Sequence, residues 1–290
     1  MNEFERRMGT KKQHPAEMLK LRLASQSKKT NVEVEARYGI PDLLNADGTL
    51  DSKGYRVLYS GEEMEVDTKF VHEREVEFSG ARIPNVQAFY RDEHGANTED
   101  EIIAKWRDNK SREKNGQMEM AVTALLSEML PEDFLIVRTA AYDDYKNGVD
   151  NLILDRKTGE VVGAFDEVHE GGDGRRTEEK KLKIQNIARK GGARIRYGLR
   201  LAEGKLTRAS LEGVPVFYLG LESSELLELV QGLAENDSKK KEKIFHKLLS
   251  SLRLQHGELE KNANTALLRA RLASFGQSLS RLDKTEQKAA

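Results

Sequence analysis

The sequence predicts an α/β protein in which a mixed central sheet is flanked by helices and followed by a C-terminal helical extension. A helical apolar pattern comes first and stops at Pro131. Three apolar segments of strand type follow, at residues 134–137, 149–154 and 161–168. From Ser223 onward, the apolar residues again recur at helical spacing.

The first helix is predicted from residue 116 to 129. Its apolar residues follow one another at the spacing of a helix face: Met118, Ala121, Val122, Leu125 and Met129. Residues 144–148 then read as a turn before the second strand, and residues 155–159 as a hairpin turn after it. The third strand is apolar on both faces until two acidic residues interrupt it.

A basic helix is expected after the third strand. Gly171–Gly174 reads as a flexible loop, Thr177 as the N-cap of the helix, and Gly191 with Gly192 as its end. A further apolar strand at residues 214–219 completes the order helix, three strands, helix, strand.

The chain divides into three parts by composition. Residues 1–110 are too poor in apolar residues to define a core, and we expect them to be poorly defined and partly disordered. Within them, residues 66–78 suggest an exposed hairpin, and residues 18–23 fit either a helix or a strand. Residues 111–222 form the α/β core, and residues 223–290 form basic C-terminal helices.

Composition excludes several classes of protein. The 290 residues are 33% charged and contain no cysteine and six histidines, so a disulfide scaffold, a thiol nucleophile and a zinc–cysteine site are excluded. The chain has no apolar run long enough to cross a bilayer and no apolar leader at its start, so we expect a cytoplasmic protein with no membrane partner.

The charges are segregated although the net charge is only −1. Residues 132–170 carry ten acidic side chains against four basic ones. Residues 171–212 reverse this, with twelve basic side chains against five acidic ones. An acidic block next to a basic one suits a cation-dependent site beside a surface that binds phosphate.

Carboxylates inside apolar strands point to a metal site. Asp150 and the pair Asp166 and Glu167 lie on two strands joined by a short turn. Neighbouring strands are about 5 Å apart, so their carboxylates can converge on one hard divalent cation such as Mg²⁺. Since side chains alternate along a strand, we expect only one residue of the pair to join Asp150.

These residues resemble the PD-(D/E)XK nuclease superfamily over roughly residues 116–221. Asp150 resembles the hairpin aspartate of that family, Glu167 the second acid, and Glu119 the helix glutamate. The resemblance implies a restriction-endonuclease-like fold and a Mg²⁺- or Mn²⁺-dependent nuclease. Asp150, Glu167 and Glu119 would be its metal ligands.

The usual lysine of the family's tripeptide is replaced by His169. Either His169 acts in its place, or a lysine of the following helix reaches the site, with Lys180 favoured over Lys181. The resemblance places the basic helix against the phosphate backbone. The residues expected to bind substrate there are Lys181, Lys183, Gln185 and Arg189.

Each of these residues also has a structural interpretation. Asp150 also fits a strand-end cap, Glu119 a solvated helix residue, and His169 a polar strand end. Three functions therefore remain open: a nuclease acting on nucleic acid, DNA in preference to RNA; an inactive nucleic-acid-binding relative; and a helical interaction or scaffold protein. A homodimer is compatible with the family resemblance.

Overall fold

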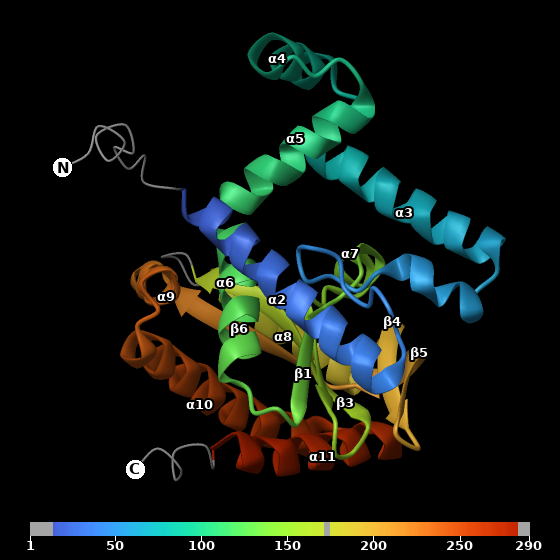
Figure 1. Ribbon diagram of the computed structural model, residues 1–290, viewed down its shortest axis with the longest axis vertical. Coiled ribbons are helices and arrows are strands. Elements are labelled where there is room, and N and C mark those ends of the chain that lie inside the picture. The colour runs from blue at the N-terminus through green and yellow to red at the C-terminus, as the bar shows by residue number, and fades with distance from the viewer. Residues whose placement is uncertain (1–13, 171–174, 284–290) are drawn as a thin grey trace.

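The structure is a computed structural model that describes residues 14–170 and 175–283. Over these residues the protein is α/β and mostly helical, with a mixed four-stranded sheet, a two-stranded hairpin and C-terminal helices (Figure 1). The predicted α/β class is confirmed. The predicted elements occur in the predicted order, but a short helix separates the first two strands and a hairpin precedes the last strand.

The main sheet has the strand order β1-β2-β3-β6. Its strands are β1 (Phe134–Arg138), β2 (Asn151–Asp155), β3 (Glu160–Glu170) and β6 (Val216–Glu222). The first two pairs are antiparallel, and β3 pairs in parallel with β6, Glu167 opposite Leu219. Because a parallel pair requires a long crossover, the chain between β3 and β6 passes through a helix on its way.

Helices cover the sheet. Helix α6 (Lys114–Met129) packs against β1 and β3, and α8 (Arg175–Arg189) packs against β3 and β6. The predicted N-cap Thr177 is wrong, since α8 begins at Arg175. The predicted loop at 171–174 lies outside the described residues.

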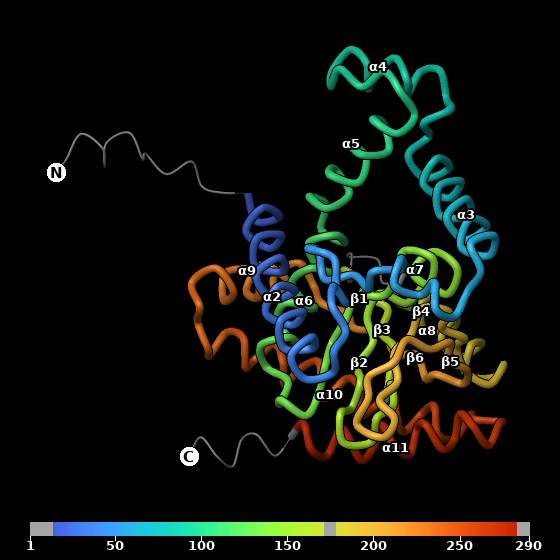
Figure 2. Tube along the Cα trace, turned by 45° about the vertical axis from the view of Figure 1, so that its right-hand side comes forward, coloured from blue at the N-terminus to red at the C-terminus, as the bar shows by residue number. Residues whose placement is uncertain are grey.

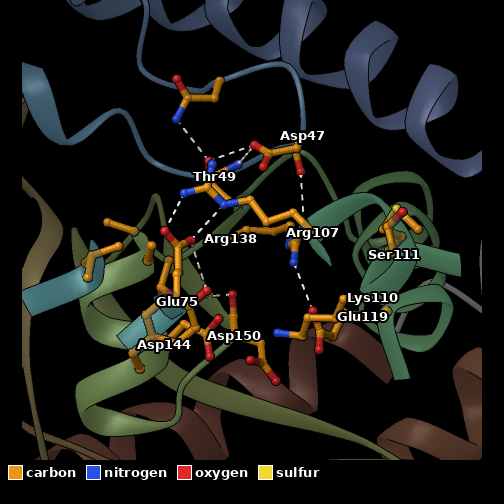
Figure 3. Close-up of a pocket in the computed structure, with 18 of the residues that line it drawn as sticks. Asp47, Thr49, Glu75, Arg107, Lys110, Ser111, Glu119, Arg138, Asp144 and Asp150 are labelled. Atoms are coloured by element: carbon orange, nitrogen blue, oxygen red, sulfur yellow. Dashed lines mark hydrogen bonds and ion pairs between the residues drawn. The ribbon is translucent and has the colours of Figure 1, made fainter. Parts of the chain in front are cut away.

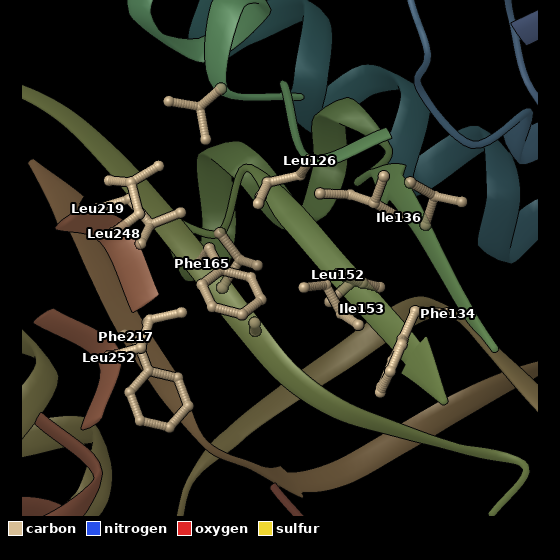
Figure 4. Packing of buried hydrophobic residues seen from close by; sticks show 14 of the residues in the cluster. Leu126, Phe134, Ile136, Leu152, Ile153, Phe165, Phe217, Leu219, Leu248 and Leu252 are labelled. Carbon is tan, nitrogen blue, oxygen red and sulfur yellow. The ribbon is translucent and has the colours of Figure 1, made fainter. Parts of the chain in front are cut away.

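The C-terminal helices complete the core. These are α9 (Ser223–Glu235), α10 (Ser238–Asn262) and α11 (Ala266–Asp283). Phe275 of α11 stacks on Phe217 of β6 with ring centroids 4.3 Å apart, and Phe165 of β3 lies 6.0 Å from Phe217. Figure 4 shows Phe165 and Phe217 beside Leu248 and Leu252 of α10. The predicted C-terminal helices are therefore part of the same core as the sheet.

Residues 14–112, to which the sequence assigned no fold, are largely helical. They contain α2 (Pro15–Tyr38), the 3-10 helix η1 (Ser52–Val57), α3 (Gly61–Ser79), α4 (Pro84–His94) and α5 (Glu99–Arg112). The hairpin expected at 66–78 is wrong. Ser60 and Glu63 form a capping box that starts α3, and Gly80 ends it in the left-handed conformation. Residues 18–23, for which the sequence allowed either a helix or a strand, are helical.

Helices α3, α4 and α5 form a helical arm that extends from the body, with α4 at its far end (Figure 2). The arm has a small core of its own, made by Val76, Ala81, Tyr90, Ala96, Ile102 and Ile103. Its near ends return to the body, where α3 contacts α7 and α5 contacts α6.

Two more local predictions differ from the structure. The expected turn at 144–148 is the end of a short helix, α7 (Ala141–Asn147), which Gly148 caps in the left-handed conformation. An additional hairpin of β4 (Ala193–Ala202) and β5 (Lys205–Val214) precedes β6. The hairpin turn predicted at 155–159 is present. In the described part of the chain, no helix is both long and apolar enough to cross a bilayer.

We expect Phe217→Ala to lower the free energy of unfolding by about 3–5 kcal/mol, because it removes the ring that Phe165 and Phe275 pack against. Phe89→Ala is the matched control, because Phe89 is exposed on α4, and it should cost about 1 kcal/mol or less. Urea unfolding measures both. Equal losses in the two variants would contradict the assignment of the core.

Candidate active site

Asp150 lies directly before β2 and is held by the backbone of β3. Its Oδ2 accepts a hydrogen bond from the Glu167 N–H at 2.7 Å, and its own N–H donates to the Phe165 carbonyl at 2.7 Å. The Asp150 carbonyl accepts from the Thr139 N–H at 2.9 Å. Asp150 is therefore buried and fixed at the joint between β1, β2 and β3.

Glu167 of β3 is connected to helix α6 through two side chains. Its Oε1 accepts a hydrogen bond from Asn151 Nδ2 at 2.9 Å, and Asn151 Oδ1 accepts one from Thr123 Oγ1 at 3.1 Å. Its other oxygen, Oε2, is buried and has no hydrogen-bond partner among the described residues. A buried acceptor without a partner is costly, which indicates that a proton or a cation belongs there.

Glu119 comes from α6, as the sequence predicts. Its Oε2 lies 3.1 Å from Nη2 of Arg138, which stands at the end of β1. Both side chains are largely buried, Glu119 being 15% exposed and Arg138 16%. The structural interpretation of Glu119 as a solvated helix residue does not fit this position.

Asp166 also belongs to the site, together with two lysines of α8. It forms an ion pair with Lys180, and Lys183 Nζ lies 3.5 Å from its Oδ2. Burial lowers the pKa of Lys180, but the carboxylates of Asp166, Asp150 and Asp144 outweigh this and leave the pKa raised. Lys180 thus stays charged within electrostatic reach of the carboxylates.

We refer to Glu119, Asp144, Asp150, Asp166 and Glu167 as the acidic cluster. Burial raises the pKa of Asp150 well above its usual range, and the other four carboxylates raise it further. Burial likewise raises the pKa of Glu167 to about 8, helped by Glu119 and Asp166. The pKa of Asp144 is about 6, raised by burial first and by Glu119 second. The expectation that one residue of the pair 166 and 167 joins Asp150 stays a prediction: Glu167 donates its N–H to Asp150, and the carboxylate of Asp166 pairs with lysines of α8.

A cavity of about 580 Å³ opens beside the cluster (Figure 3). Asp150, Asp144 and Glu119 line it from the sheet and from helices α7 and α6. The helical arm lines it with residues of different chemistry, from α3 and α5: Val71, Glu75, Trp106, Arg107, Asp108, Lys110 and Ser111. The part of the chain without a predicted fold thus builds much of the cavity.

The remaining predicted site residues lie apart from the carboxylates. His169 Nε2 shares a hydrogen bond of 2.9 Å with Ser223 Oγ at the start of α9. Lys181 pairs with Glu178, and Arg189 Nη1 lies 3.5 Å from Asn186 Oδ1. Gln185 is half-buried between them on α8. Of the four predicted substrate-binding residues, Lys183 is the one placed beside the acidic cluster.

Sequence reasoning missed Asp144 and Asp166 as site residues, and also Arg138 and Lys110. Asp144 was assigned to a turn, because the short helix α7 leaves little periodic signal. Asp166 was set aside because side chains alternate between the two faces of a strand. Two charges can still interact when their side chains lie on opposite faces of a sheet. Arg138 and Lys110 had no local signal, since their roles depend on contacts with distant segments.

The oxygen-only donor set has the chemistry of a Mg²⁺ or Mn²⁺ site. In the described residues, however, no three histidine, aspartate or glutamate side chains are grouped closely enough to hold a metal ion by themselves. Mg²⁺ commonly binds through only one or two carboxylates, with waters and substrate phosphate completing its shell. The orphaned Oε2 of Glu167 and the fixed carboxylate of Asp150 fit that mode of binding.

Comparison of the chain with protein-family models, with curated proteins and with solved structures gave no match.

We expect the metal-free protein to lose stability as the pH rises from about 4.5, the ordinary pKa of a glutamate, to about 8, the pKa of Glu167. In this window the native state holds a proton that the unfolded state has released, so rising pH favours unfolding. Thermal unfolding in chelator from pH 5 to pH 9 measures the effect.

Glu167→Gln should reduce this slope, because its amide does not titrate, and should leave the part that Asp150 and Asp144 contribute. Adding Mg²⁺ should raise the unfolding temperature more at pH 8 than at pH 5, since the cation competes with the proton. Glu160→Gln, at the other end of β3, should keep the slope. A slope that Glu167→Gln leaves unchanged would show that Glu167 is not the titrating group.

Proposed function

We propose that the protein is a divalent-metal-dependent nuclease that hydrolyses phosphodiester bonds in nucleic acid, DNA in preference to RNA. The observation that carries this proposal is the buried Asp150, which lines a cavity together with Glu119 and accepts a hydrogen bond from the backbone N–H of Glu167. The charged Lys180 is held at the neighbouring Asp166. Buried carboxylates with raised pKa values, here Asp150 and Glu167, beside a half-buried charged lysine are typical of a functional site.

The topology supports the same proposal. The order α6, β1, β2, β3, α8, β6, with β3 and β6 parallel, agrees with the restriction-endonuclease-like core that the PD-(D/E)XK resemblance implies. In this comparison the β4–β5 hairpin is an insertion between the second helix and the last strand. Fold likeness alone does not establish activity, so the proposal depends on the side chains.

Asp150 and Glu167 would hold the metal, with Glu119 contacting it through a water molecule. A bound Mg²⁺ or Mn²⁺ lowers the pKa of a water molecule and offsets negative charge on the phosphate. The protein's own contribution is to fix the carboxylates: Asp150 through the Glu167 N–H, and Glu167 through Asn151 and Thr123.

Lys180 would take the role of the family's missing lysine. It carries its charge into the site from α8 and is held there by Asp166. His169, which the sequence offered as the other candidate, has its ring nitrogen engaged by Ser223. In the proposed reaction Lys180 orients the attacking water or stabilises the charge that develops on the phosphate.

The basic helix would contact the backbone of the substrate. Lys181, Gln185 and Arg189 follow one another at intervals of four along α8, so they share one side of the helix. Lys183 points instead toward Asp166. We propose that the row of three binds phosphates on either side of the cleavage position.

The second candidate is an inactive nucleic-acid-binding relative with the same fold. It is favoured by the ion pairs of Glu119 with Arg138 and of Asp166 with Lys180, which already neutralise two members of the acidic cluster. A scaffold made by the C-terminal helices alone is not favoured, because Phe275 of α11 packs against Phe217 in the common core.

The proposal predicts Mg²⁺- or Mn²⁺-dependent cleavage in a panel of plasmid, linear, branched and single-stranded nucleic acids. Asp150→Asn and Glu167→Gln should each lower the rate by about 100-fold or more, because each removes a carboxylate that would hold the metal. Glu160→Gln, an acid of β3 at the far end of the strand, is the matched control and should retain the rate.

Cleavage that persists in both site variants would overturn the assignment. Binding that weakens steeply with salt, without cleavage under any metal, would favour the inactive relative.

Lys180→Met should lower the cleavage rate by about 100-fold or more while leaving substrate affinity nearly unchanged, because the charge acts on the reacting phosphate. Lys205→Met, at an exposed lysine of β5, and His169→Gln should both retain the rate to within about tenfold. Single-turnover cleavage at saturating substrate separates rate from affinity. A larger loss in His169→Gln than in Lys180→Met would reverse the roles assigned to these two residues.

A further inference from the structure

The helical arm brings an aromatic and cationic surface to the cavity. The Lys110 ammonium lies 5.8 Å from the ring centroid of Trp106 and 6.0 Å from that of Tyr145. We call these three residues the aromatic wall, and all three line the cavity that also contains Asp150 and Glu119. Phe78, 48% exposed, extends the wall, its ring 6.3 Å from Trp106 and 5.8 Å from Tyr145.

A buried carboxylate holds the wall in place. Glu75 of α3 accepts hydrogen bonds from Arg107 Nε of α5 at 2.8 Å and from the Tyr145 hydroxyl of α7 at 3.2 Å. Glu75 is only 3% exposed, so these bonds connect the three helices α3, α5 and α7 through one buried carboxylate. The wall is therefore formed before any ligand arrives, which reduces the entropic cost of binding.

The wall and the acidic cluster are suited to different parts of one ligand. Aromatic rings stack on nucleobases with little regard to sequence, and a lysine beside them attracts phosphate. The positive charge of Lys110 also acts on the acidic cluster: it lowers the pKa of Asp144, whereas burial raises that pKa. A base on the wall would thus place its phosphate near Asp150.

The size of the cavity limits the form of the ligand. A volume of about 580 Å³ lies within the usual range of small-molecule sites. A cavity of this size holds a nucleotide, and a paired duplex is too large to enter it. A strand must therefore be unpaired where it reaches the wall.

We propose that the aromatic wall binds an unpaired nucleotide of a single-stranded nucleic acid, next to the phosphodiester bond that faces Asp150. The base stacks against Trp106 and Tyr145, and Lys110 contacts its phosphate. This inference rests on the proposed function and specifies its substrate class as single-stranded segments or frayed ends.

Trp106 is the only tryptophan of the chain, so its fluorescence reports occupancy of the wall. The wild-type protein in chelator, which prevents metal-dependent cleavage, is titrated with a 12-nucleotide single strand and with its blunt duplex. We expect saturable quenching by the single strand and an affinity at least about fivefold weaker for the duplex.

Lys110→Ala should weaken single-strand binding and reduce the slope of log affinity against log salt by about 0.7, the value for one lost phosphate contact. Lys105→Ala, an exposed lysine on the same helix that does not line the cavity, is the matched control and should leave both quantities unchanged. Trp106→Ala is read by anisotropy of a labelled strand, with circular dichroism to verify that the helices are intact.

The outcomes separate this inference from the proposed function. One contrary outcome is metal-dependent cleavage with equal affinity for single strand and duplex. Another is metal-dependent cleavage in which Lys110→Ala binds the single strand as Lys105→Ala does. Either would overturn the inference and leave the nuclease proposal standing. Quenching that depends on Lys110, without cleavage under any metal, would support the inference and overturn the nuclease proposal. An absence of binding to either strand form would overturn the inference.

Discussion

The burial of several carboxylates within electrostatic reach of one another is the constraint around which the rest of this structure is arranged. Asp150 and Glu167 are both taken out of water, and the other members of the acidic cluster raise their pKa values further. Burying several negative charges is unfavourable unless bound protons, metal ions or basic side chains in ion pairs offset the charge. Arg138 and Lys180 supply part of this compensation from β1 and α8. Glu167 Oε2 has no hydrogen-bond partner among the described residues, so its charge is not compensated by them.

The helical arm helps to enclose the cavity beside the buried carboxylates. It stands away from the body and has a small core of its own, yet its near ends line the cavity above the carboxylates. Glu75 joins α3, α5 and α7 there, so the arm and the acidic cluster are held in one fixed arrangement. Its chemistry complements that of the sheet, with rings and a lysine facing carboxylates. In the proposed function, a substrate carrying both bases and phosphates would use the two surfaces at once.

Local sequence singled out three carboxylates, and it predicted the strand that carries Glu167 and the strand that begins directly after Asp150. Asp150 and Glu167 were singled out because acids in or beside apolar elements are unexpected, and Glu119 was singled out by the family resemblance. Both glutamates act electrostatically on Asp150 in the structure. The basic partner was less clear. His169 and Lys180 were both candidates, and only the packing of α8 against β3 shows that Lys180 reaches Asp166 while His169 contacts Ser223. The arm was missed because its helices, marked by caps such as Ser60 with Glu63, carry few apolar residues.

The sequence by itself determined the α/β class, the order of the core elements and the helical C-terminal part, because apolar periodicity reports directly which residues face a core. It also determined which acids are unusual, since an ionisable residue in an apolar run has a local signature. Only the tertiary structure decided which basic side chain lies near these acids and that Asp144 interacts with them. It also decided that Trp106 and Tyr145 line the same cavity. Those relations are contacts between segments far apart in the chain, and no local pattern encodes them, because they arise only when the helices and strands pack.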